Sequence, residues 1–288
     1  MQRASLDEVR SFYARLMAGA AQSNDARLER IFELVPRELF MPPGPWKVMV
    51  NDRYFETPSA DPVYLYQNAL IALDASKGIN NGMPFLHAAW IGKAAPQSGE
   101  VVVHIGAGTG YYSAILSLLV LPGGRVEAFE LEEHLAERAT GNLAAFDNVT
   151  IHNADAVSLP LPDADLIYVN AGVSAPPASW LHALKAGGRM IFPWRPAEKI
   201  AMACLISRKP AGFAFKPLHP AGFIPCVGAS EADRAAIQAP DYAAVWNTQA
   251  VHLTADRAPD ETATAVYADL WFSREPLSAP AASGGSGS

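Results

Sequence analysis

A short stretch with glycine at every second position has the composition of a ligand-binding turn. Gly106, Gly108 and Gly110 follow the β-branched run at 101–105 and precede a helical pattern that starts at Tyr111. Because glycine has no Cβ, the backbone of such a strand-turn-helix unit can approach a ligand closely, and the helix N-terminus favours an anionic group. The dinucleotide fingerprint requires its third glycine three residues after the second, and Tyr111 occupies that position. The spacing therefore disfavours an NAD-dependent oxidoreductase.

Acidic residues follow the next two predicted strands. Glu130 ends the strand predicted over 125–130, where an acid can accept hydrogen bonds from both hydroxyls of a ribose. Asp155 follows the strand predicted over 149–152, where the amino group of an adenine would lie. Each acid also has a simpler interpretation, Glu130 as a solvated acid at a helix start and Asp155 as a helix cap. Together, the three features at consecutive strand ends predict a nucleoside-binding site.

The elements that must position these residues alternate between strand and helix. Short β-branched runs predict the strands, and apolar residues at helical spacing predict the helices. This alternation indicates a doubly wound α/β fold, in which a mostly parallel sheet is covered on both faces. The predicted elements are strand 101–105, helix 111–121, strand 125–130, helix 132–145, strand 149–152, strand 165–170, helix 177–185 and strand 188–193.

Three motifs of the chain match one protein family. Residues 35–40 (VPRELF) form an entry motif, 103–111 (VHIGAGTGY) a first cofactor motif, and 184–193 (LKAGGRMIFP) a late strand motif. Over most of residues 30–230 the chain resembles the protein-L-isoaspartate O-methyltransferases, which are class I methyltransferases that use S-adenosylmethionine (SAM). The resemblance implies a Rossmann-like methyltransferase fold, SAM as the methyl donor and a carboxylate as the methyl acceptor.

The spacing and the resemblance together predict the residues that contact SAM. The glycine loop would receive the amino-acid end of SAM, Glu130 its ribose and Asp155 its adenine. His104 stands where the family has an acid, so it removes a charge partner of the methionine ammonium group or changes how that group is held. The predicted SAM-binding residues are His104, Gly106, Ala107, Gly108, Gly110, Tyr111, Glu130, Leu131, Asp155 and Ala156.

The acceptor site departs from the family. There a Thr-Ile-Ser-Gln/Ala-Pro segment delivers a serine to the acceptor carboxylate, whereas residues 78–84 of this chain read GINNGMP. Counting from Tyr66 puts Asn80 at the serine position, and counting back from the glycine loop puts Gly82 there. We predict that Asn80 or Asn81 replaces the serine as a hydrogen-bond donor to the acceptor carboxylate, and the alternative is that Asn-Asn-Gly is only a turn.

The reaction type depends on the acceptor. A carboxylate acceptor is already anionic and needs no general base, because methyl transfer depends mainly on positioning. A hydroxyl or amine acceptor would benefit from a base, and His87 is the nearest candidate in sequence, although a lone helical histidine is more often structural. Two other hypotheses stay open: a methyltransferase of a small metabolite or modified peptide, and a SAM-binding module without catalytic activity.

The segments that flank the core complete the predicted organisation. Ser5 and Glu8 form a capping-box pattern, and a second helix is predicted to open near Asp25 and to end before Pro36. Residues 1–95 are predicted to be a helix-and-loop segment that covers the acceptor site. The remaining predicted parts are the SAM-binding core at 96–208, a β-rich extension of the same domain at 209–275 and a flexible tail at 276–288. After Ala201, the β-like runs at 201–207, 222–227 and 265–272 are predicted to extend the sheet at one edge.

Composition excludes several classes of function. The net charge of −7 over 288 residues gives no basic footprint for nucleic acid. Two cysteines without metal-ligand spacing predict neither a zinc site nor a disulfide framework. The N-terminus lacks the pattern of an export signal, and the longest apolar run, 114–121, is too short to span a membrane. We therefore expect a cytoplasmic protein that binds SAM and a carboxylate-bearing acceptor, with its oligomeric state left open.

Overall fold

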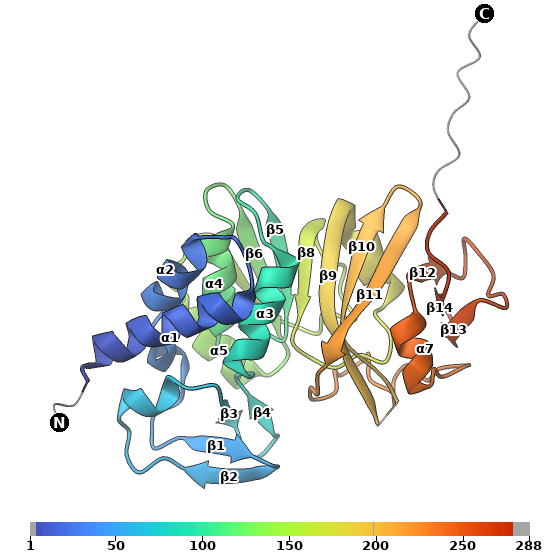
Figure 1. The fold of residues 1–288 in the computed structure, drawn as a ribbon. Coiled ribbons are helices and arrows are strands. Elements are labelled where there is room, and N and C mark those ends of the chain that lie inside the picture. The colour runs from blue at the N-terminus through green and yellow to red at the C-terminus, as the bar shows by residue number, and fades with distance from the viewer. Residues whose placement is uncertain (1–3, 198, 279–288) are drawn as a thin grey trace, which may run out of the picture. The chain divides into compact units, whose positions relative to one another are not determined.

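The structure is a computed structural model that describes residues 4–197 and 199–278 (Figure 1). The chain forms two compact units, residues 1–171 and 172–288. The domain boundaries predicted after residues 95 and 208 stay a prediction. Of the predicted tail at 276–288, residues 279–288 lie outside the described part of the chain.

A parallel sheet forms the centre of the first unit. Its strands stand in the order β8-β5-β6-β7 and all pair in parallel, as the alternation of strands and helices predicts. Every residue of β5 is buried, in keeping with a β-branched and apolar sequence that only His104 interrupts. The carboxyl ends of the four strands therefore meet at one edge of the sheet. The strands are β5 (Val101–Ile105), β6 (Arg125–Glu130), β7 (Val149–Asn153) and β8 (Ala164–Val169).

The helices of this unit either connect the strands of the sheet or pack against other helices. α4 (Tyr111–Leu119) joins β5 to β6, and α5 (Glu133–Asn142) joins β6 to β7. The helix predicted to reach residue 121 ends at Leu119, because Pro122 disfavours helical backbone before it. α1 (Leu6–Ala21) packs against α2 (Arg27–Leu34) and α3 (Pro84–Ala94), and α2 packs against α4.

The helix starts follow the sequence signals closely. Ser5 Oγ accepts a hydrogen bond from the Glu8 N–H at 3.3 Å, and Glu8 Oε2 accepts one from the Ser5 N–H at 2.7 Å. This reciprocal pair confirms the predicted capping box. Asp25 Oδ1 accepts from the Arg27 N–H at 3.0 Å, so the second helix opens where predicted.

A small antiparallel sheet shows that the helix-and-loop prediction for residues 1–95 was wrong (Figure 1). Its strands follow the order β2-β1-β3-β4. A two-residue loop, Asn51 and Asp52, joins the first two strands, and both residues have positive φ (49° and 60°), as tight hairpins require. The strands of this sheet are β1 (Lys47–Val50), β2 (Arg53–Glu56), β3 (Leu70–Asp74) and β4 (Ile79–Asn80), and two short 3-10 helices, η1 (Arg37–Phe40) and η2 (Pro62–Leu65), lie in the same part of the sequence.

The second unit is mainly an antiparallel sheet with the order β9-β10-β11-β12-β14-β13. The strand predicted at 188–193 is longer than expected, and three elements, β11, α7 and β12, were not predicted. The elements are α6 (Ala178–Ala183), β9 (Leu184–Ala197), β10 (Ile200–Lys209), β11 (Gly212–Pro220), α7 (Tyr242–Asn247), β12 (Ala250–Leu253), β13 (Ala263–Val266) and β14 (Leu270–Ser273).

Two β predictions for this unit were wrong. Within the described part of the chain, residues 222–227 form no strand and make only an isolated bridge from Pro225 to Gly172. Proline has no N–H to donate to a ladder, which accounts for this difference. The run at 265–272 is two strands, because the chain turns where the Tyr267 N–H donates to the Leu270 carbonyl at 2.9 Å.

The described residues contain neither a candidate membrane span nor a candidate metal site. None of their helices is long and apolar enough to cross a membrane. No group of three metal-ligating side chains is placed to hold a metal ion in residues 4–197 and 199–278. Cys204 and Cys226 are buried, and they form no disulfide bond within the described residues.

Candidate active site

The glycine loop connects β5 to α4 in the conformation that its sequence predicts. Gly106, Gly108 and Gly110 all have positive φ (76°, 57° and 92°). A Cβ at Gly110 would lie 2.5 Å from Leu143 Cδ1, so packing as well as backbone conformation excludes a side chain there. The Gly106 and Ala107 N–H groups donate to the Phe129 carbonyl at 2.9 and 3.0 Å.

These hydrogen bonds limit which N–H groups can donate to a ligand. Because the Gly106, Ala107, Gly108 and Gly110 N–H groups already have protein acceptors, most of the groups that remain for an anion belong to the first turn of α4, which begins at Tyr111. The first N–H groups of a helix have no intrahelical acceptor, and the helix dipole adds positive potential. An anionic group is therefore best held at the α4 N-terminus.

Glu130 is bound directly to the glycine loop. Its side chain lies at the end of β6 and is 7% exposed. Oε2 accepts from the Gly108 N–H at 2.6 Å, and Oε1 accepts from the Glu132 N–H at 3.0 Å. Burial raises the pKa of Glu130, and backbone hydrogen bonds from Glu132, Gly108 and Leu131 oppose that rise. A carboxylate has about four acceptor positions, so these backbone donors do not use all of them and a ribose hydroxyl can still donate to Glu130.

Asp155 lies beside Glu130, as the strand order predicts. The Ala154 N–H donates to the Glu130 carbonyl at 3.1 Å, which links the ends of β6 and β7. Asp155 Oδ1 accepts from the Val157 N–H at 2.8 Å and so stabilises a turn. No helix begins between β7 and β8, a segment that the structure describes throughout, so the helix-cap interpretation of this acid was wrong. Leu131 is 44% exposed, and Ala156 is buried. The roles of these residues toward adenine stay a prediction.

His104 is fully buried, and both its ring nitrogens contact protein groups. Nδ1 lies 2.8 Å from Ser113 Oγ, and Nε2 lies 2.8 Å from Asn170 Nδ2. Burial lowers the pKa of His104 to about 3, so the imidazole is neutral. His104 therefore offers no free ring nitrogen to a cofactor, and its effect on one must pass through Asn170 or Ser113. Sequence reasoning missed Asn170, which directly follows β8.

The two predicted acceptor-site asparagines differ in their contacts. Asn80 Oδ1 accepts from the Gly82 N–H at 2.9 Å and shapes the turn. Asn81 is buried, and its Oδ1 accepts from Arg37 Nη2 at 2.9 Å. Asn81 Nδ2 is buried without a hydrogen-bond partner. Asn81 is therefore the better candidate donor to an acceptor oxygen, while Asn80 positions the chain.

Arg37 was present in the entry motif, but its role could not be read from the sequence. It is fully buried, and it donates to the backbone carbonyls of Leu65, Gln67 and Ala69 besides Asn81. Among residues 4–197 and 199–278 no carboxylate forms an ion pair with it. A buried cation without an acid beside it makes this region favourable for an anion.

His87 brings α3 against the start of α4. The imidazole is 1% exposed, stacks on Tyr112 with a centroid distance of 3.9 Å, and places Nδ1 2.9 Å from Tyr168 Oη. A Cβ at Gly82 would lie 2.1 Å from His87 Nε2. Burial, helped by nearby His104 and Arg37, lowers the pKa of His87 to about 3. A general base works best with a pKa near the working pH, so His87 is poorly suited to that role.

The small sheet covers the glycine loop. A Cβ at Gly108 would lie 3.1 Å from Leu73 Cδ1 on β3, so a side chain of this strand lies against the loop. The β3–β4 turn is held by an ion pair between Lys77 and Glu132, at the start of α5. Tyr111 is buried, and its ring packs edge-on against Phe40 at a centroid distance of 5.6 Å. Segments before residue 95 thus enclose the amino-acid end of the predicted cofactor site.

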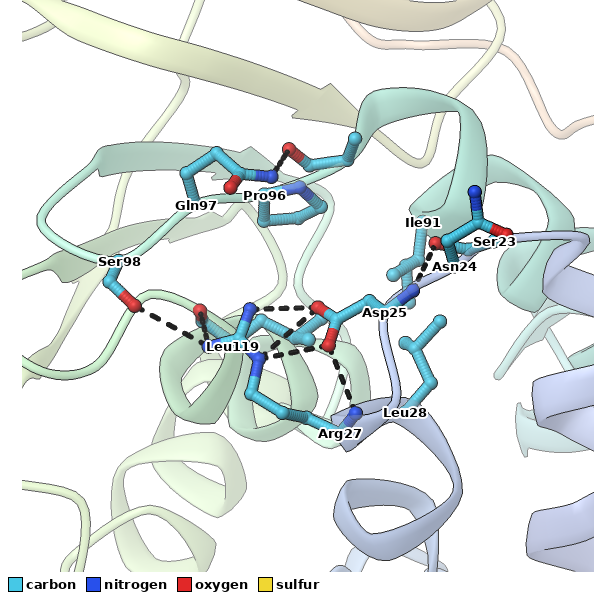
Figure 2. Close-up of a pocket in the computed structure, with 11 residues that line it drawn as sticks. Ser23, Asn24, Asp25, Arg27, Leu28, Ile91, Pro96, Gln97, Ser98 and Leu119 are labelled. Carbon is cyan, nitrogen blue, oxygen red and sulfur yellow. Dashed lines mark hydrogen bonds and ion pairs between the residues drawn. The ribbon is translucent and has the colours of Figure 1, made fainter.

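A surface pocket of about 600 Å³ lies elsewhere in the first unit (Figure 2). Its lining includes Ser98, which precedes β5, and Leu119, which ends α4, so it lies at the amino edge of the sheet, opposite the glycine loop. Figure 2 shows the Arg27 guanidinium between Asp25 and the Leu119 carbonyl, with distances of 2.7 and 3.0 Å. Its donors are thus already engaged, and we assign no ligand to this pocket.

The fold and the site define a class of protein. A doubly wound parallel sheet carries a glycine loop after its central strand, and an acid at the next strand end is bound to that loop. The alternate-glycine spacing separates this arrangement from dinucleotide-binding dehydrogenases. These features are those of a Rossmann-like methyltransferase.

Comparison with known proteins identifies the family. Residues 24–231 match the family described as Protein-L-isoaspartate(D-aspartate) O-methyltransferase, and the chain belongs to this family. It is 31% identical over 197 residues to a protein-L-isoaspartate O-methyltransferase of Ignicoccus hospitalis, covering 67% of this chain and 85% of the relative. It is 30% identical to the protein of that name from Aeropyrum pernix, covering 72% and 75% of the two chains.

Solved structures agree on the fold. A protein-L-isoaspartate O-methyltransferase superposes with a TM-score of 0.65 at 24% identity, over 77% of this chain and 67% of the other. A putative protein-L-isoaspartate O-methyltransferase from Plasmodium falciparum, solved with S-adenosyl-L-homocysteine, superposes with a TM-score of 0.60 at 16% identity, over 75% and 97%. The predicted family and fold class are therefore confirmed.

Proposed function

We propose that this protein transfers a methyl group from SAM to a carboxylate of a protein or peptide. Membership of the isoaspartate O-methyltransferase family supports both the donor and the acceptor class. The bound SAM supplies an electrophilic methyl group. Such a displacement requires mainly that the side chains of this protein hold the two reactants in line.

The residues of the site fit SAM. The α4 N-terminus suits the carboxylate of its methionine portion, and Glu130 can still accept a hydrogen bond from a ribose hydroxyl. Leu131 and Asp155 stand at the next positions along the same edge, suited to the adenine ring and its amino group. An unpartnered buried acceptor, Asn170 Oδ1, also lies beside the loop.

Family membership carries the carboxylate proposal, and the histidines and tyrosines beside the loop are poorly suited to act as a general base. Burial lowers the pKa of both His87 and His104 to about 3, and it raises the pKa of Tyr111 and Tyr112 well above their ordinary value. A hydroxyl or amine acceptor would have to lose a proton to a base, whereas a carboxylate is already ionised. The Arg37 charge nearby favours an anionic acceptor as well.

We assign the orientation of the acceptor carboxylate to Asn81. Its Oδ1 is fixed by Arg37 and its Nδ2 is a buried donor without a partner, which an acceptor oxygen would satisfy. Asn80 holds the turn through the Gly82 N–H. A cytoplasmic location, expected from the composition, is part of the proposal.

The test is incubation of the pure protein with radiolabelled SAM and a panel of acceptors. The panel contains an L-isoaspartyl peptide, its aspartyl counterpart, and peptides that offer only hydroxyl or amine groups. Label on a carboxylate peptide that is released by mild base supports the proposal. Base-stable label on a hydroxyl or amine would establish a different acceptor class, and tight SAM binding without turnover on any acceptor would indicate a non-catalytic module.

A further inference from the structure

Three uncharged side chains form a hydrogen-bonded chain beside the glycine loop. His104 is the fourth residue of β5, Asn170 directly follows β8, and Ser113 lies in the first turn of α4. The His104 ring joins the other two, with Nδ1 2.8 Å from Ser113 Oγ and Nε2 2.8 Å from Asn170 Nδ2. These hydrogen bonds thus connect the carboxyl ends of β5 and β8 to the first turn of α4, beside the predicted cofactor site.

The direction of these bonds determines what Asn170 presents. An amide nitrogen only donates, so His104 Nε2 accepts and the ring proton resides on Nδ1, which donates to Ser113. The other amide atom, Asn170 Oδ1, is buried and has no hydrogen-bond partner. A buried acceptor without a partner is unfavourable, which indicates that a donor occupies this position in the working complex.

Asn170 directly faces the glycine loop. A Cβ at Gly106 would lie 3.4 Å from Asn170 Cβ and 3.6 Å from the backbone carbonyl oxygen of Asn170. The amino-acid end of SAM carries a carboxylate and an ammonium group on one carbon atom. When the carboxylate lies at the α4 N-terminus, the ammonium group needs an acceptor close to the loop, and Asn170 Oδ1 is such an acceptor.

We propose that Asn170 Oδ1 accepts a hydrogen bond from the ammonium group of SAM, and that His104 is the positioning residue that keeps the amide turned this way. The inference rests on the proposed use of SAM. In this protein a histidine stands before the glycine loop where the family has an acid. The neutral His104 ring orients the Asn170 amide oxygen toward the ammonium group, and this oxygen replaces the charge that the acid would supply. Oδ1 is closed to bulk solvent, and a hydrogen bond from a desolvated cation is strong in such surroundings.

The first experiment compares two ligands by isothermal titration calorimetry on the full chain. S-adenosylhomocysteine carries the ammonium group, and 5′-methylthioadenosine has the same nucleoside without the amino-acid portion. Asn170→Ala is expected to weaken S-adenosylhomocysteine binding by about tenfold to a hundredfold, as for a hydrogen bond to a charged group, and to change methylthioadenosine binding less than about twofold.

Asn148→Ala is the matched control. Asn148 is also partly buried, and its amide donates to the Ser117 and Gly124 carbonyls at 3.0 and 3.1 Å, away from the carboxyl edge of the sheet. This variant is expected to leave the ratio of the two affinities unchanged. Equal weakening of both ligands by Asn170→Ala, or no weakening, would overturn the inference while leaving SAM binding intact. Failure of the wild-type protein to bind either ligand would overturn the proposed function together with it.

The second experiment reads the position of the His104 proton by ¹⁵N NMR of the imidazole. The inference requires the proton on Nδ1 at neutral pH, with Nε2 as the acceptor. A proton on Nε2 would mean that Asn170 turns its oxygen toward the histidine, and the inference would be wrong. His104→Ala, which releases the amide, is expected to weaken S-adenosylhomocysteine several-fold more than it weakens methylthioadenosine.

Discussion

Replacing Gly82 by alanine tests the packing at the acceptor side of the site. Gly82 has φ = 71°, and a Cβ there would lie 2.1 Å from His87 Nε2 and 2.6 Å from its Cδ2. The positive φ costs an L-residue about 1–2 kcal/mol, and forcing a buried ring aside costs about 1–3 kcal/mol more. We therefore expect Gly82→Ala to lower the free energy of unfolding by about 2–5 kcal/mol.

The assay is urea unfolding with linear extrapolation, in a double-mutant cycle with His87→Ala. Gly78→Ala is the matched control, because Gly78 has nearly the same φ (70°) and no atom lies within 4 Å of its added Cβ. It should cost only the backbone strain, and Gly82→Ala in the His87→Ala background should cost about the same. A cost for Gly82→Ala that equals the Gly78→Ala cost, or that His87→Ala does not reduce, would refute the packing described here.

Three further predictions concern charge. Lowering the pH through the raised pKa of Glu130 protonates the ribose acceptor, so calorimetry should show weaker S-adenosylhomocysteine binding, an effect that Glu130→Gln removes. Arg37→Met leaves buried acceptors without a donor and should cost roughly 3 kcal/mol or more in urea unfolding, whereas a cost below about 1 kcal/mol would contradict its structural role. Burial keeps the pKa of His87 and of His104 at about 3 in the folded chain, below the ordinary 6.5. Stability is thus full above pH 6.5 and falls by about 1.4 kcal/mol per pH unit for each histidine below it, and His104→Gln should remove one such contribution.

The cofactor side of the site could be predicted well from the sequence because its signals are local. Three glycines between a buried strand and a helix specify the loop. An acid at the end of the next strand lies beside that loop, because the two strands pair in parallel and their carboxyl ends meet. The Gly108 N–H bond to Glu130 confirms that the sequence brings these residues together. The strand over 125–130 was also predicted to the residue.

The acceptor side could not be predicted, because its contacts join distant segments. Arg37 and Asn81 are 44 positions apart, and no local sequence pattern predicts that the Arg37 guanidinium donates to the Asn81 side chain. Asn170 was missed because a single asparagine after a strand carries no motif. The small sheet had a local signal in Asn51 and Asp52, two residues suited to positive φ between runs rich in valine and aromatics, which the helix-and-loop interpretation overlooked.

The most direct test of the account is a crystal structure of the protein with S-adenosylhomocysteine. The account predicts that the ribose hydroxyls lie within hydrogen-bond distance of the Glu130 carboxylate, and that the amino-acid portion lies at the start of α4 beside Asn170. A ligand bound elsewhere, or a ribose turned away from Glu130, would contradict it.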